Sequence, residues 1–140
     1  YHRCTNCELI FQHPTPSPSQ ITSFYPDNYD IYEEQSRLKK LSSIKKSILK
    51  KKFAYLHLKT SFLADFLALL IPKNLVSYHP RFIQNGLLLD VGCGNGRYLD
   101  GMRQLGWDVK GVEFNATAVG VCKLYKLDVH LGELISASFE

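Results

Sequence analysis

The sequence predicts an α/β protein with about three parallel strands, preceded by helices and an irregular, cysteine-containing leader. Short apolar stretches at residues 87–91, 108–113 and 127–131 have the length and composition of buried strands. Segments with helical spacing of apolar residues separate these strands, and a glycine-rich turn joins the first strand to the first helix. Strands that alternate with helices are typical of a parallel sheet.

Composition excludes several classes of protein. The chain has 140 residues and is 45% hydrophobic, which suffices for one domain with a modest core and excludes a disordered chain. The longest apolar stretch, residues 62–71, contains Asp65 and falls short of the roughly 20 residues that cross a bilayer, so no transmembrane segment is expected. The four cysteines do not form the framework of a small secreted domain, and we expect a cytoplasmic protein.

The first segment, residues 1–35, carries Cys4 and Cys7 and then alternating prolines. The spacing of Pro14, Pro16 and Pro18 predicts an extended linker rather than a helix through residue 20. An aromatic stretch follows, and its tyrosines are candidates for a lid over a ligand or for plain packing: Tyr25, Tyr29 and Tyr32.

The second segment, residues 36–86, is expected to be helical and partly basic. Apolar residues recur with helical spacing from Leu38 to Leu56, and residues 61–70 form a second predicted helix that Pro72 stops. Between Arg37 and Lys59 the chain has nine Lys or Arg and no acid, although its net charge is only +4. A membrane surface, an RNA backbone or an anionic substrate fits these lysines, and so does a solvated helix face. Because the rest of the chain is nearly balanced in charge, a nucleic-acid partner is not expected.

The third segment, residues 87–140, is the predicted α/β part. The strand at 87–91 leads through a glycine loop into a helix with one apolar face, which ends at Gly106. The strand at 108–113 follows, then a helix capped by Asn115 that runs to about residue 126, and then the strand at 127–131.

The glycine loop is the main candidate binding site. Glycine permits unusual backbone dihedrals and close approach of a ligand, and the start of a helix offers free N–H groups. Gly92, Gly94 and Gly96 alternate at this point, so we expect the loop to hold a cofactor at the carboxyl end of the first strand. The alternative is a tight strand-to-helix turn that binds nothing.

The spacing of the glycines distinguishes between two cofactors. Dinucleotide-binding loops have G-x-G-x-x-G, whereas here the third glycine comes two positions after the second and Asp90 precedes the loop. The stretch from Asp90 to Gly96, DVGCGNG, resembles the first motif of class I S-adenosylmethionine-dependent methyltransferases. The resemblance implies a Rossmann-like methyltransferase sheet. It also implies that Asp90 serves the amino end of the methionine moiety, while the loop, Cys93 included, approaches the ligand.

Further candidate residues lie at the ends of the next two strands. Glu113 ends the second strand, and an ionised carboxylate can accept hydrogen bonds from both ribose hydroxyls. The resemblance implies that Phe114 lies along the adenine and that Glu133, after the third strand, helps to bind it. Arg97 is a candidate for the methionine carboxylate. An exposed strand-end acid is the alternative for Glu113, and a solvated loop acid is the alternative for Glu133.

The cysteine pair is the candidate metal site. Two thiolates in C-x-x-C spacing can supply one side of a tetrahedral zinc site, although Cys4 and Cys7 need two more ligands. A redox dithiol or two unpaired thiols would give the same sequence. The pair and the following Pro-x-Pro and Phe-Tyr motifs resemble the zinc-ribbon leader of a subset of bacterial methyltransferases. That resemblance implies zinc in a full-length chain.

The combined interpretation is methyl transfer from S-adenosylmethionine to a small-molecule acceptor. The chain starts at Tyr1 rather than Met and supplies about three strands, so we expect a piece of a longer enzyme that is inactive alone. No catalytic residue is assigned, because aligning donor and acceptor, worth roughly 7–11 kcal/mol, outweighs general-base help. The alternatives are a nicotinamide-dinucleotide-binding domain and a non-catalytic module that binds through the zinc ribbon or the basic helix.

Overall fold

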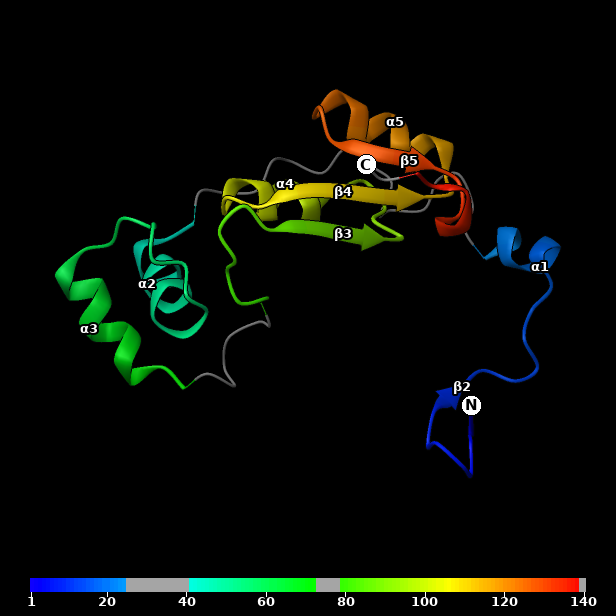
Figure 1. Cartoon of the computed structure of the whole chain (residues 1–140), viewed down its shortest axis with the longest axis horizontal. Coiled ribbons are helices and arrows are strands. Elements are labelled where there is room, and N and C mark those ends of the chain that lie inside the picture. The colour runs from blue at the N-terminus through cyan, green and yellow to red at the C-terminus, as the bar shows by residue number, and fades with distance from the viewer. Residues whose placement is uncertain (25–40, 73–78, 139–140) are drawn as a thin grey trace. The chain divides into compact units, whose positions relative to one another are not determined.

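The structure is a computed structural model that describes residues 1–24, 41–72 and 79–138 (Figure 1). The chain forms two compact units, Tyr1–Asp30 and Ile31–Glu140. The basic helical segment therefore belongs to the same unit as the α/β part. The division into three segments stays a prediction, and the tyrosines at 25, 29 and 32 lie outside the described residues, as do Leu38 and the lysines at 39 and 40.

The first unit contains a small β-hairpin around the cysteine pair. Strands β1 (His2–Arg3) and β2 (Ile10–Phe11) pair in antiparallel register. The turn between them is held by hydrogen bonds from the Cys4 N–H to the Leu9 carbonyl (2.8 Å) and from the Glu8 N–H to the Cys4 carbonyl (3.0 Å). Strands of two residues are too short to show a periodic pattern, so the sequence did not predict the hairpin.

The prediction of an extended linker through residue 20 is wrong at its end, where helix α1 (Pro18–Ser23) begins. Proline fits the first position of a helix because the N–H that it lacks would have no partner there. The backbone N–H of Ser17 donates to Oε1 of Gln20 at 2.8 Å, which is the return half of a capping box. The S-x-x-Q spacing is the signal that identifies this helix start.

Two helices of the second unit carry the basic and the apolar segments. Helix α2 (Ser43–Lys52) begins after Ser42, whose hydroxyl accepts the Lys45 N–H at 3.3 Å. It ends at Lys52, so the expected continuation toward Leu56 is wrong. The backbone turns there, and Ala54 has a φ of 63°. Helix α3 (Phe62–Leu70) has the predicted bounds to within one residue and is capped by Ser61.

The predicted parallel sheet is confirmed. Its strands β3 (Leu87–Val91), β4 (Asp108–Glu113) and β5 (Asp128–Leu131) lie side by side in that order (Figure 1). Helices α4 (Arg97–Gln104) and α5 (Ala116–Leu124) connect them, and a short 3₁₀ turn η3 (Leu134–Ser136) follows. The parallel register brings the carboxyl ends of β3 and β4 together, because Val91 faces Val112. This edge carries the glycine loop.

A buried aromatic contact joins the helical segment to the opposite, amino-terminal edge of the sheet. The hydroxyl of Tyr55 is fully buried, accepts a hydrogen bond from Nε1 of Trp107 (3.0 Å) and donates to the Pro80 carbonyl (3.1 Å). Because Trp107 immediately precedes β4, the segment after α2 is fixed at the start of that strand. Phe82 packs against both rings, with centroid distances of 5.1 and 5.9 Å.

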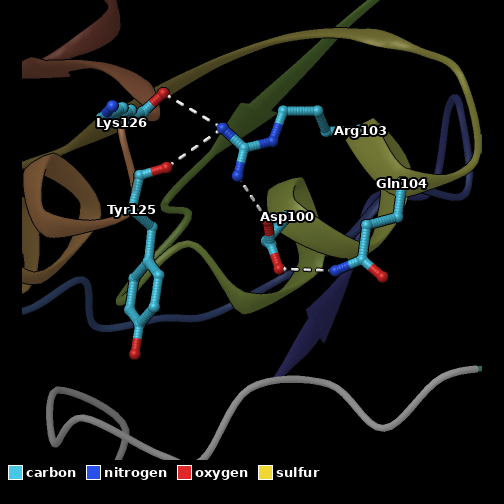
Figure 2. A network of polar contacts seen from close by, with 5 residues as sticks. All are labelled: Asp100, Arg103, Gln104, Tyr125 and Lys126. Atoms are coloured by element: carbon cyan, nitrogen blue, oxygen red, sulfur yellow. Dashed lines mark hydrogen bonds and ion pairs between the residues drawn. The ribbon is translucent and has the colours of Figure 1, made fainter.

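Arg103 ties the end of α4 to the end of α5 (Figure 2). Its Nη1 donates to the carbonyl oxygens of Tyr125 (3.0 Å) and Lys126 (3.1 Å), and its Nη2 contacts Oδ1 of Asp100 at 2.6 Å. Gln104 donates to the other oxygen of Asp100. A guanidinium beside the last carbonyls of a helix satisfies groups that have no partner within the helix.

Candidate functional site

The candidate site is built on the loop between β3 and α4. Its three glycines adopt positive φ angles: 77° at Gly92, 54° at Gly94 and 75° at Gly96. Residues other than glycine adopt a positive φ only with strain. The N–H groups of Gly92 and Cys93 both donate to the Val112 carbonyl, at 2.8 and 3.2 Å, so β4 holds the start of the loop.

The outer two glycines have different surroundings. A Cβ added to Gly92 would meet nothing within 4 Å, so the loop is open to a ligand at this point. A Cβ added to Gly96 would lie 2.5 Å from Leu127 Cδ1 and 2.8 Å from the Cys122 sulfur. Gly96 is therefore required for packing the loop against α5 and the turn before β5, whereas Gly92 leaves space for a bound molecule.

Glu113 lies beneath the loop rather than at its rim. Its Oε2 accepts the Gly94 N–H at 2.8 Å, and its Oε1 accepts the Asn115 N–H at 2.9 Å. The residue is only 3% exposed. The carboxylate therefore organises the loop and the start of α5. Each of its oxygens still has a second lone pair with which to accept a hydrogen bond from a ligand.

Asp90 and Glu113 form a pair of acids at the carboxyl ends of adjacent strands. Asp90 faces Gly111 across the ladder, and Glu113 lies two residues beyond Gly111, so both side chains lie on the same face of the sheet. Burial, and then the charge of Glu113, raise the pKa of the Asp90 carboxyl. A cationic group placed between these acids would relieve that repulsion.

The side chain of Cys93 points away from the open part of the loop. It is buried, and a Cβ on Gly111 would lie 2.8 Å from its sulfur. A hydrogen bond with Cys122, together with burial, raises the pKa of the Cys93 thiol, which therefore stays protonated. Only the backbone of Cys93, and not its side chain, is placed to approach a ligand.

The remaining predicted residues surround the loop at greater exposure. Phe114 follows β4 and is partly exposed, and Arg97 opens α4 with its N–H donating to the Asn95 side chain at 3.3 Å. Glu133 precedes η3 as an exposed residue, and its carbonyl accepts the Ser136 hydroxyl at 2.7 Å. All three lie after the carboxyl end of β3, β4 or β5.

Sequence reasoning missed two residues that support the loop. Gly111, in the middle of β4, leaves room for Leu99 and Cys93, since a Cβ there would lie within 2.8 Å of both side chains. Cys122 fills the space under Gly96, and its thiol donates to the Gly94 carbonyl at 3.3 Å. A glycine inside a strand signals close approach of another group and identifies Gly111. Nothing in the local sequence marks Cys122.

Cys4 and Cys7 lie at the turn of the amino-terminal hairpin, so the structure brings this pair together. Backbone N–H groups of Cys7 and Asn6, and then the Cys7 thiol, lower the pKa of the Cys4 thiol. A thiolate is the form that binds metal. Within residues 1–24, 41–72 and 79–138, no group of three or more His, Cys, Asp or Glu side chains is arranged to hold a metal ion. Zinc at this pair stays a prediction.

The site thus joins an open glycine loop, two strand-end carboxylates and an aromatic ring. Carboxylates accept hydrogen bonds from hydroxyl and ammonium groups, and an exposed ring can stack on a flat heterocycle. A three-stranded parallel sheet with this loop and these acids at its carboxyl edge is consistent with part of a Rossmann-like methyltransferase fold.

Comparison with known proteins agrees with this class. Residues 89–140 match the family described as a methyltransferase domain, and this match includes the loop, Glu113 and Glu133. A ubiquinone biosynthesis O-methyltransferase of Paraburkholderia phymatum is 44% identical over 41 residues, which are 29% of this chain and 18% of that protein. The match thus spans less than a fifth of the relative's length. Residues 89–140 are therefore similar to a methyltransferase domain, and the match does not reach the cysteine pair.

Proposed function

We propose that this protein binds S-adenosylmethionine at the loop 92–96 and takes part in methyl transfer to a small-molecule acceptor. One observation carries the proposal. The glycine loop is open at Gly92 and lies directly over the carboxylate of Glu113, at the carboxyl edge of the sheet. Ligands of parallel α/β sheets bind at this edge.

Each part of the donor has a partner of matching chemistry. The vicinal hydroxyls of the ribose are suited to Glu113, and the cationic amino group of the methionine moiety is suited to Asp90. Phe114 supplies a ring for the adenine, and Glu133, which follows β5 at the same edge of the sheet, contributes a polar group. Because Glu113 is buried and accepts the Gly94 N–H, we infer that the loop shifts slightly as the ribose enters.

The chemistry comes from the donor, which supplies an electrophilic methyl group on a sulfonium. The task of the protein is to hold the donor rigidly and to exclude water, and alignment of this kind is worth roughly 7–11 kcal/mol. The name of the relative describes methylation of an oxygen in ubiquinone biosynthesis. Since the relative matches over so short a stretch, the proposal for this chain stops at the donor and at a small acceptor.

Calorimetric titration of S-adenosylhomocysteine, with NAD⁺ in parallel, tests the proposal. We expect saturable binding of the homocysteine compound and none of NAD⁺. Glu113→Gln should weaken binding at least about tenfold, because a hydrogen bond to a charged acceptor is worth roughly 1.5–3 kcal/mol. The matched control is Glu8→Gln, which changes an exposed acid of the hairpin unit and should leave binding unchanged. Binding of NAD⁺ instead, or of neither compound to the folded chain, would contradict the proposal.

A further inference from the structure

Helix α3 turns its large apolar side chains outward. Only the small residues Ala64 and Ala68 are buried, whereas Phe62 is 88% exposed and Leu70 is 68% exposed. The other exposed side chains of the helix are also apolar: Leu63, Phe66, Leu67 and Leu69. A surface helix of a water-soluble domain has the opposite arrangement, with polar residues outside. An apolar surface of this kind marks an interaction site.

Helix α2 packs against α3 and supplies positive charge beside it. It carries five lysines and no acid, and they are Lys45, Lys46, Lys50, Lys51 and Lys52. Among the residues that the structure describes, ion pairs occur at Arg103 and at Lys110, and none involves a lysine of α2. Lys50 contacts the Thr60 hydroxyl at 3.2 Å, and the charge of the other four lysines is available to an anionic partner.

Asp65, the sole acid in residues 41–72, does not oppose such a partner. It is partly buried, and its Oδ2 accepts a hydrogen bond from the Thr60 hydroxyl (3.1 Å), which in turn lies 3.2 Å from the Lys50 ammonium. The Ser47 hydroxyl, Thr60 and the nearby Lys50 and Lys51 lower the pKa of the Asp65 carboxyl. The Asp65 carboxylate of α3 is thus linked through the Thr60 hydroxyl to Lys50 of α2.

We propose that the α2–α3 surface, defined by the exposed Phe and Leu of α3 and the lysines of α2, docks on an anionic phospholipid bilayer. In this arrangement α3 lies in the plane of the interface with its apolar side chains among the acyl chains, and the lysines meet the headgroups. No helix in the described parts of the chain is long and apolar enough to cross a membrane. The proposed contact is peripheral, with α3 lying at the surface of the bilayer.

Charge favours a bilayer over a second copy of the chain. Two copies that cover each other's α3 bring the lysines of both α2 helices together, and like charges repel. An anionic bilayer satisfies the apolar side chains and the lysines at once. The surface is also compatible with donor binding, because Tyr55 fixes the helical segment to the amino-terminal edge of the sheet and the glycine loop lies at the carboxyl edge.

Vesicle flotation with the 140-residue chain tests the proposal. The probes are vesicles of phosphatidylcholine mixed with phosphatidylglycerol, and vesicles of phosphatidylcholine alone. We expect the chain to float with the mixed vesicles and to be released as salt concentration rises, since surface attraction is screened by salt. Equal binding to both kinds of vesicle, or no binding by folded protein, would overturn the proposal.

Matched double variants separate the two contributions to binding. Phe62→Gln with Leu70→Gln should weaken binding by about tenfold or more per site, because a buried Phe or Leu contributes strongly. Leu124→Gln with Ile135→Gln removes comparably exposed apolar residues outside α3 and should have no effect.

The charge variants follow the same design. Lys45→Gln with Lys51→Gln should weaken binding about fivefold per lysine, and Lys123→Gln with Lys126→Gln is the control of equal charge. Fluorescence of Trp107, the only tryptophan, verifies that each variant is folded. A dimer in light scattering that the α3 variant abolishes, without vesicle binding, would assign the surface to a second copy and refute the bilayer.

Discussion

The substitution Gly96→Ala tests whether Gly96 is required for the backbone and the packing of the loop. The backbone of Gly96 has a φ of 75°, so alanine there is strained, and its Cβ would lie 2.5 Å from Leu127 Cδ1. Left-handed backbone costs about 1–2 kcal/mol for a residue with a side chain, and overpacking a core costs about 1–3 kcal/mol. The expected loss in the free energy of unfolding is therefore about 2–5 kcal/mol.

Two other glycines serve as controls for the two contributions. Gly92→Ala has the same kind of strain, with a φ of 77°, but meets nothing within 4 Å, so only about 1–2 kcal/mol should be lost. Gly120→Ala lies within α5 with open space around it and should add about 0.5–1 kcal/mol. Urea unfolding followed by Trp107 fluorescence measures all three. Equal losses for Gly96→Ala and Gly92→Ala would refute the packing role of Gly96.

Three further predictions follow from other contacts. Asp90→Asn should raise the stability of the ligand-free protein at neutral pH and weaken S-adenosylhomocysteine binding, because burial and Glu113 raise the pKa of Asp90; lower stability by thermal unfolding would contradict this. Tyr55→Phe should cost about 1–3 kcal/mol in urea unfolding, since the buried Trp107 N–H loses its acceptor; no loss would refute that bond. The pKa of Asp65 is lowered in the folded protein, so this carboxylate contributes fully to stability above its ordinary pKa of about 4. That contribution is lost as the pH falls through the pKa of the folded state. If Asp65→Asn left the acid unfolding curve unchanged, this prediction would be contradicted.

The α/β part was predictable because its signals are local. The apolar stretch at 87–91 and the stretch at 108–113 became β3 and β4 with the same bounds. Asn115 caps α5 through its side chain, which accepts the Ala118 N–H at 3.0 Å. Leu127 was expected in the last strand but belongs to the turn before it, since its N–H donates to the Cys122 carbonyl.

The remaining features depend on contacts between distant residues. The sequence placed Glu113 at a strand end, but nothing local indicates that Gly94 and Asn115 donate to it. Residues 61–70 predicted α3, yet a stretch that is apolar on nearly every side, with Asp65 as its one charge, does not indicate which side packs. Only its packing against α2 shows that the alanines face inward.

The two proposals concern opposite edges of one sheet and can fail separately. The donor site depends on the carboxyl edge, where Asp90 and Glu113 lie, and the membrane surface depends on α2 and α3. A variant that abolishes vesicle flotation should leave S-adenosylhomocysteine binding intact. Loss of both by Phe62→Gln with Leu70→Gln would show that the surfaces are coupled, which the contacts described above do not predict.

Amide resonances of the loop test the central claim most directly. The chain has 140 residues, and its Gly92, Gly94 and Gly96 N–H groups each report on one point of the site in a ¹⁵N-labelled sample. Addition of S-adenosylhomocysteine should shift these resonances and that of Asn115, with the Gly94 signal sensitive to the bond with Glu113. NAD⁺ should shift none of them. Shifts confined to residues away from the loop, or no shifts in a folded sample, would contradict the assignment of the donor site.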